Sequence, residues 1–143
     1  MGARKLFMIL VLLSVALPTA ARAELYRVRS TEMGIRAFDV TVIELKREER
    51  TSLLSIPGYH NRSAAASRWM MCAYTDLALK RGFKFWAAVA SDPPDDSVLL
   101  GFPQSAGEDI AQTLGPRFAG DSPLTGSTET FAALCGITPK PTQ

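Results

Sequence analysis

The most regular pattern of apolar and polar positions in the chain lies between Asn61 and Arg81. This segment contains neither Pro nor Gly, and its apolar positions recur in steps of three and four residues, at Ala66, Trp69, Met70, Ala73 and Leu77. Such spacing places the apolar side chains on one stripe of an α-helix. Asn61 or Ser63 is suited to cap the start of the helix, and Gly82 stands where a left-handed residue commonly ends one. The pattern therefore predicts a helix of about five turns.

Shorter segments on both sides of this helix have the composition of β-strands. Before it, Tyr26–Arg29 alternates between apolar and polar residues, and Ile35–Leu45 is rich in β-branched residues. After it come Phe83–Ala90 and Val98–Phe102. These segments predict strands, and the two prolines of Asp92–Ser97 predict a loop between the last two strands, which we expect to form an antiparallel pair.

The remaining segments predict loops and two short helices. The charged run Lys46–Arg50 is typical of a solvated strand end or loop. Ser105 and Glu108 have the spacing of a capping box before one short helix, and Ser127 is suited to cap another. Residues 115–126 contain three glycines and two prolines, which favour a loop.

The order of these elements predicts the fold class. Strands, a long helix, further strands and short helices along one chain indicate an α+β fold. We expect a small, mostly antiparallel sheet covered by the Asn61–Arg81 helix, with one or two short C-terminal helices. No internal repeat or change of composition divides the chain after residue 23, so residues 24–143 are expected to form a single domain, with residues 139–143 as a frayed tail.

The first 23 residues have the layout of a secretory signal peptide. Two basic residues precede an apolar run from Leu6 to Leu17, and a stretch of small residues ends at Ala23. About 12 apolar residues make a helix of about 18 Å, too short for a hydrocarbon core of about 30 Å. The sequence therefore predicts cleavage after Ala23 and export to the periplasm or beyond, without stable membrane insertion of the cleaved protein.

Cleavage changes the charge balance of the protein. The full chain has 16 basic and 14 acidic residues, and residues 1–23 contain three of the basic residues and none of the acidic ones. The cleaved protein would thus carry a net charge of −1 rather than +2. A nucleic-acid partner is not expected, because no basic stretch interleaved with aromatic residues remains.

The two cysteines, Cys72 and Cys135, both remain after cleavage. Thiols of exported proteins tend to pair, so we expect one disulfide, which would connect the middle of the long helix to a C-terminal helix. The alternative is that both are buried apolar residues too far apart to bond. Two cysteines and the single His60 offer too few ligands for a typical zinc site, and no metal or cofactor is expected.

The segment Arg68–Val89, RWMMCAYTDLALKRGFKFWAAV, resembles a signature of uncharacterised small bacterial envelope proteins. In these proteins a helix with an Arg and paired alanines precedes a Gly and an aromatic strand. Many of them are lipoproteins, whereas this sequence has no cysteine at the expected cleavage site. The resemblance covers some 22 residues; it implies an α+β fold and a periplasmic location, and it carries no catalytic residues.

Three groups of residues are candidates for chemistry or binding. His60 is the only histidine and thus the most plausible acid–base group, although it also suits a surface loop. Asp92, Asp95 and Asp96 offer oxygen ligands for calcium but are equally common as turn residues. Trp69 and Trp86 either flank a ligand groove between helix and sheet or belong to the core.

The expected function follows from export, small size and the shortage of acid–base residues. We expect a non-enzymatic periplasmic protein that binds a partner protein or another envelope component. The alternatives are a small-ligand-binding domain that uses the groove between helix and sheet and, after it, a small hydrolase-type enzyme. No catalytic or cofactor-binding residue is predicted.

Overall fold

A computed structural model describes residues 25–120 and 123–138 of the chain. The predicted signal peptide of residues 1–23, with its cleavage site after Ala23, and the predicted tail of residues 139–143 lie outside the described residues. Among the described residues, no helix is both long enough and apolar enough to cross a membrane.

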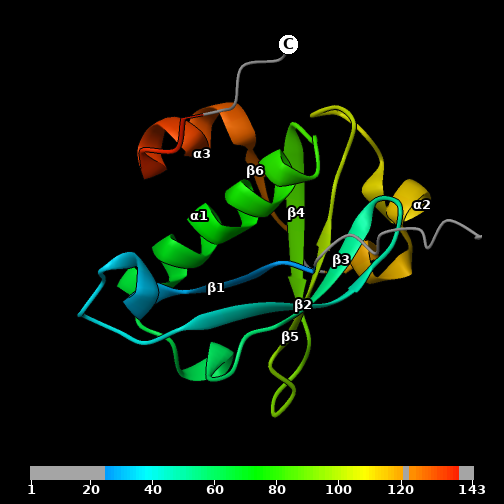
Figure 1. The fold of residues 1–143 in the computed structure, drawn as a ribbon. Helices are drawn as coiled ribbons and strands as arrows, with labels where there is room; N and C mark the ends of the chain where they lie inside the picture. The colour runs from blue at the N-terminus through cyan, green and yellow to red at the C-terminus, as the bar shows by residue number, and fades with distance from the viewer. Residues whose placement is uncertain (1–24, 121–122, 139–143) are drawn as a thin grey trace, which may run out of the picture.

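The fold is built on one six-stranded sheet (Figure 1). Its strands lie in the order β1-β2-β3-β5-β4-β6, and each pair of neighbours is antiparallel. The strands are β1 Arg27–Arg29, β2 Thr41–Arg47, β3 Thr51–Ser55, β4 Phe85–Ala90, β5 Ser97–Gly101 and β6 Leu124–Ser127. The sheet curls like half of a barrel, and the strand order makes β1 and β6 its two edges.

Three α-helices accompany the sheet in the described part of the chain: α1 Ala64–Lys80, α2 Ile110–Leu114 and α3 Thr128–Cys135. Three single turns of 3₁₀-helix connect elements: η1 Ser30–Met33, η2 Tyr59–Asn61 and η3 Pro116–Ala119. The predicted caps of the long helix are confirmed, because Ser63 Oγ accepts the amide hydrogen of Ala66 and Gly82 follows the helix at φ +81°. Ser127 caps α3 as predicted, accepting the amide hydrogen of Thr130.

The predicted α+β fold, a small sheet covered by one long helix, is wrong. The six-stranded antiparallel sheet dominates the structure, and of the three described α-helices α1 has 17 residues whereas α2 and α3 have only 5 and 8. α1 does not cover the sheet alone, since α3 packs beside it on the same side. A side chain at Gly101 would meet Leu114 of α2 and Phe118 of η3, which places these two elements against the opposite face. The expected fold lacked β3 and β6, and these two strands make the sheet wide.

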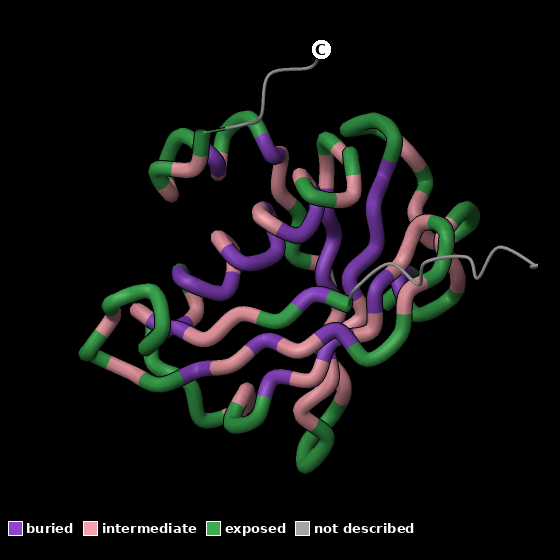
Figure 2. The backbone as a smooth tube through the Cα atoms, viewed as in Figure 1, coloured by how far each residue is buried: buried purple, intermediate pink, exposed green. Residues whose placement is uncertain are grey.

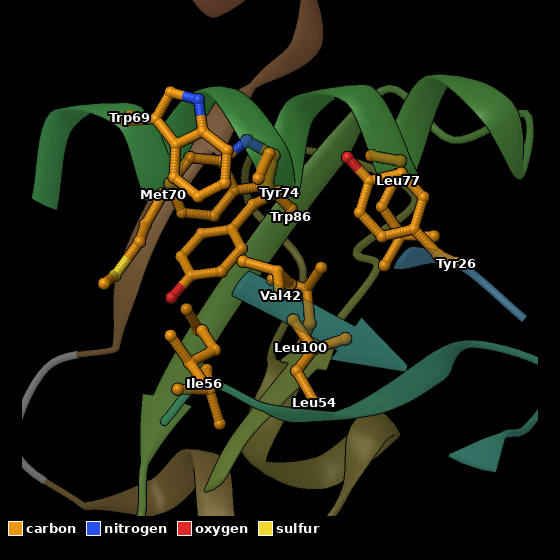
Figure 3. Packing of buried hydrophobic residues seen from close by; sticks show 14 of the residues in the cluster. Tyr26, Val42, Leu54, Ile56, Trp69, Met70, Tyr74, Leu77, Trp86 and Leu100 are labelled. Atoms are coloured by element: carbon orange, nitrogen blue, oxygen red, sulfur yellow. The ribbon is translucent and has the colours of Figure 1, made fainter. Parts of the chain in front are cut away.

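The main core lies between the sheet and α1 (Figure 2), where buried residues follow the inner stripe of the helix and the middle strands. Figure 3 shows the side chains of Trp86 of β4 and Tyr74 of α1 next to each other in this core. The indole of Trp86 is fully buried, packs edge-on against Tyr74 and donates a hydrogen bond of 3.0 Å to Thr75 Oγ1. Alternate residues of the other strands complete the core: Val42, Leu54, Val98 and Leu100.

Two further element predictions differ from the structure. The strand predicted over Ile35–Leu45 begins only at Thr41, because the chain before it forms a loop closed by Ser30. Ser30 donates its hydroxyl to Phe38 C=O and accepts the Val40 amide hydrogen, and its own amide bonds Val40 C=O. The capping box predicted for Ser105 and Glu108 does not form, because Asp109 caps α2.

Candidate binding site

An apolar groove of about 260 Å³ runs between the edge strand β1 and the helix α1. We call it the β1–α1 groove. One side of the groove is lined by β1 with the preceding Tyr26, by η1 and by Ile35. The other side is lined by α1, and the end by Cys135 of α3 and by Ile137. Its lining residues are Tyr26, Val28, Met33, Ile35, Trp69, Cys72, Ala73, Asp76, Cys135 and Ile137.

Side-chain size along α1 shapes the groove. Ala73 and Cys72 are small and lie at the middle of the helix wall, so the wall is shallow there. Trp69, one helical turn earlier, is held by an edge-on contact with Phe38, with ring centroids 6.1 Å apart. On the other side Met33 is 62% exposed, a large apolar side chain left open to solvent at the groove. The groove is thus an apolar surface that the described residues do not cover.

The predicted disulfide is present and forms one end of the groove. Cys72 of α1 and Cys135 of α3 are bonded with an S–S distance of 2.00 Å and a Cα–Cα distance of 5.7 Å. As the sequence predicted, the bond connects the middle of the long helix to the C-terminal helix. Because both cysteines line the groove, the disulfide also holds α3 and Ile137 in place as its end wall.

One carboxylate lies on the apolar lining. Asp76 Oδ2 accepts a hydrogen bond of 2.9 Å from the hydroxyl of Tyr26 and one of 3.0 Å from Lys80 Nζ. Burial raises the pKa of the Tyr26 phenol, and the charge and hydrogen bond of Asp76 raise it further. Tyr26 therefore stays protonated at physiological pH, and its hydroxyl holds the Asp76 carboxylate next to the start of β1.

A second hollow, of about 400 Å³, lies where β1 starts and α1 ends. We call it the cationic hollow, because three of its six lining residues carry positive charge. Its lining residues are Leu25, Tyr26, Arg27, Arg47, Leu77 and Lys80. Tyr26 lines both the cationic hollow and the β1–α1 groove, so the two sites adjoin along β1.

The cationic hollow is supported by a buried carboxylate. Glu44, 2% exposed, accepts hydrogen bonds from Arg47 at 2.9 and 2.6 Å, from the Ser52 hydroxyl at 2.6 Å and from the Tyr26 amide at 2.9 Å. Burial alone would raise the pKa of Glu44, but these hydrogen bonds outweigh burial and lower it. Glu44 is therefore ionised at neutral pH and fixes Arg47 at the hollow.

The two tryptophans do not flank a common groove. Trp69 is 7% exposed and lines the β1–α1 groove, whereas Trp86 fills the core between helix and sheet. Trp86 also touches a different hollow of about 380 Å³, between β4, β6 and residues 103–110, which includes Phe85, Phe131 and Glu108. Each tryptophan thus belongs to a separate cavity.

The side chains of His60, Asp95 and Asp96 take structural hydrogen bonds, and Asp92 accepts the Asp95 amide through its backbone oxygen. His60 lies in η2, where its Nε2 is 2.9 Å from the backbone oxygen of Asp95. Asp95 accepts the Ser97 amide and Asp96 accepts the Gly58 amide, so both carboxylates order the turn. Among the described residues, no three His, Cys, Asp or Glu side chains gather as a metal site requires.

The segment Arg68–Val89, which carries the resemblance to small envelope proteins, spans most of α1, the left-handed Gly82 and most of β4. It provides the Trp69 wall and the Cys72 anchor of the groove. The fold relation that the resemblance implies stays a prediction. Comparison of the chain with protein-family models, with curated proteins and with solved structures finds no match.

Proposed function

We propose that this protein is an exported periplasmic binding protein that holds an apolar segment of a partner protein in the β1–α1 groove. The observation that carries the proposal is the groove itself, where Met33 stands 62% exposed beside Trp69 and Ala73. Apolar surface left open on a folded protein commonly marks an interaction site. The signal-peptide layout of residues 1–23 and the disulfide between Cys72 and Cys135 support the oxidising compartment.

Site-specific photo-crosslinking in living cells tests the groove as the contact surface. A photoreactive amino acid replaces Met33 in one variant and Leu124 in another. Both residues are exposed and apolar, but Leu124 lies on β6, at the opposite edge of the sheet. We expect one envelope protein to be crosslinked through position 33 and not through position 124. The same background at both positions would contradict the proposal.

The compartment is tested separately. Fractionation of cells that produce the tagged protein should find it in the periplasm, and mass spectrometry should give a chain that starts at Glu24. Recovery of the uncleaved chain from the membrane fraction would contradict export as a cleaved protein.

A small-ligand function is the second candidate, and the hollow near Trp86 favours it. With about 380 Å³, aromatic rings and a carboxylate, this hollow is of a size that small molecules occupy. Because the chain has only two tryptophans, Trp69→Phe and Trp86→Phe each leave one reporter. A ligand at this hollow would change the fluorescence of the Trp69→Phe variant, and occupation of the β1–α1 groove would change that of Trp86→Phe.

A further inference from the structure

The outer edge of β1 is open among the described strands, because β1 pairs only with β2. At one end of this pair the Glu44 amide donates to Tyr26 C=O at 2.8 Å, and at the other the Ser30 amide donates to Val40 C=O at 2.9 Å. Residues in an antiparallel pair alternate between those bonded to the neighbouring strand and those whose backbone groups point away. Tyr26 and Ser30 therefore belong to the bonded set.

The same alternation tells in which direction the backbone N–H and C=O groups of each residue of β1 point. Val28, two residues after Tyr26 and opposite Val42, also bonds to β2. Arg27 and Arg29 direct their N–H and C=O groups toward the outer edge. These two residues offer two donors and two acceptors in the spacing that an added strand requires.

The two faces of β1 differ in chemistry. Tyr26 and Val28 point to the α1 side and line the groove, so Arg27 and Arg29 point to the other face. A strand added at this edge would place its alternate side chains in the same two environments, because residues directly opposite each other share a face. Its apolar residues would enter the β1–α1 groove, and the residues between them would lie beside the arginines.

Charge favours an acidic residue opposite Arg27. Arg47 lies opposite the inward-facing Ser52 and Lys80 belongs to α1, so these two cations of the hollow lie on the α1 side, and the positive charge on the other face comes from Arg27. Its own acidic partner, Glu32, is 3.5 Å away and both side chains are more than half exposed, so this ion pair is weak. Arg29, by contrast, is held by Asp39 through two hydrogen bonds of 2.8 and 2.6 Å.

The same charges disfavour a second copy of this chain as the added strand. In antiparallel self-pairing, the outward residues Arg27 and Arg29 would have to bond the same residues of the other copy. Every such register places an arginine opposite an arginine on one face, which is unfavourable. Charge at a strand edge is a known means of preventing self-association.

We infer that the partner binds as an added antiparallel strand on the outer edge of β1, with alternating acidic and apolar residues, the apolar ones in the β1–α1 groove and an acidic one beside Arg27. This inference rests on the proposed function and names the chemistry of its partner. Backbone hydrogen bonds to Arg27 and Arg29 supply affinity, and the β1–α1 groove and the charge of Arg27 supply specificity.

A synthetic peptide of alternating glutamate and valine, capped at both ends, tests the inference on the purified, processed protein. N-methylation of the backbone amides of the glutamate residues blocks their hydrogen bonds to Arg27 and Arg29. N-methylation of the same number of valine backbone amides alters only groups that point away from β1. We expect the first change to weaken binding at least about tenfold and the second to leave it within about twofold. Hydrogen exchange should show the Arg27 and Arg29 amides fast without peptide and slowed with it.

Charge reversal supplies a matched test of specificity. A peptide with lysine in place of glutamate should bind weakly to the wild-type protein and more tightly to the Arg27→Glu variant. Equal binding of the glutamate and lysine peptides would overturn the acidic preference, and equal effects of the two methylations would overturn strand addition.

The remaining outcomes separate this inference from the proposed function. Slow exchange of Arg27 and Arg29 without peptide would show that the chain itself or a second copy covers the edge, and sedimentation would tell which. If no peptide binds but position 33 still crosslinks to one envelope protein, strand addition fails and the groove function stands. If neither peptide binding nor a crosslink is found, both fail.

Discussion

Gly126 of β6 lies directly opposite Trp86 of β4, and its missing side chain leaves the space that the indole ring occupies. A Cβ atom at Gly126 would come within 2.5 Å of Trp86 Cζ2 and 2.8 Å of Phe131 Cε2. Such distances are shorter than any van der Waals contact permits, so the ring and an alanine at this position exclude each other. Because Gly126 has no side chain, the edge strand β6 packs directly against Trp86 at the centre of the core.

Gly126→Ala should therefore destabilise the protein by about 1–3 kcal/mol, the range typical of overpacked cores. The matched control is Gly107→Ala, because a Cβ atom there meets nothing within 4 Å. Chemical unfolding of both variants checks the prediction, and the control should stay within about 0.5 kcal/mol of the wild type. Equal stability of the two variants would show that Trp86 moves aside at no cost.

The same pair of residues explains why β6 was missed from the sequence. Residues 115–126 contain glycines and prolines that indicate a loop by local rules, and most of the segment does lie outside strands. Gly126 can pair with Trp86, 40 positions earlier, because it has no side chain to meet the indole, and no local pattern reveals such a contact. The prediction of α1 succeeded because its apolar stripe, its Ser63 cap and Gly82 are all local signals.

β3 was missed for a related reason. Its inward positions are Ser52 and Leu54, both fully buried, so the strand presents a polar residue where the pattern should show an apolar one. Ser52 is tolerated in the core because Glu44 and Arg81 bond its hydroxyl. In the same way Glu108 was assigned to a local capping box, whereas it bonds Arg50, 58 positions away. Of the candidate site, the sequence predicted the disulfide and, as an alternative, a groove between helix and sheet flanked by Trp69 and Trp86. Trp69 lines the observed groove and Trp86 does not, and the place of the groove beside β1 depends on how β1 and α1 come together.

Removal of the disulfide should cost about 4 kcal/mol of unfolding free energy, because Cys72 and Cys135 are 63 positions apart and the bond restricts a long loop of the unfolded chain. Replacement of both cysteines by alanine, followed by urea unfolding, measures this cost. Reductant should lower the stability of the wild type and leave that of the double variant unchanged. An effect of reductant on the variant would show that the loss of stability does not come from this disulfide. Thiol labelling of the native wild-type protein would show that the bond is absent.

Acid should destabilise the protein through Glu44. Its hydrogen bonds lower its folded-state pKa beneath the unfolded value of about 4.3. A depressed carboxyl pKa stabilises the folded state fully above the unfolded value, and this stability is lost as the pH falls through the folded-state pKa. Unfolding free energies should thus fall as the pH decreases below about 5.

The Glu44→Gln variant isolates this contribution. Its amide does not titrate, so its unfolding free energy should depend less steeply on pH below about 5 than that of the wild type. Glu49→Gln, at an exposed position in the turn between β2 and β3, is the control and should keep the wild-type slope. Identical slopes for all three proteins would show that Glu44 does not couple folding to protonation.

Replacement of Arg81, the residue that caps the end of α1, by lysine should lower the stability of the protein. The Arg81 guanidinium donates to the backbone oxygens of Thr51, Glu48 and Glu49 and to the Ser52 hydroxyl, and so ties the helix to the hairpin of β2 and β3.

A lysine keeps the charge of Arg81 but has one nitrogen in place of the planar fork, so it cannot reach both sides of the turn. Two hydrogen bonds from a charged donor are worth about 3–6 kcal/mol, and two of the bonds of Arg81 are exposed to solvent, so Arg81→Lys should cost about 2–4 kcal/mol. Arg117→Lys is the control, because exposed Arg117 bonds only the Ser91 hydroxyl in the described part of the chain, and its loss should cost less than about 0.5 kcal/mol. The same hairpin carries Glu44, whose carboxylate accepts the Tyr26 amide next to β1, so Arg81→Lys should also weaken binding of the acidic peptide, whereas Arg117→Lys should not. Unchanged stability of Arg81→Lys would mean that a point charge suffices and that the fork geometry contributes nothing.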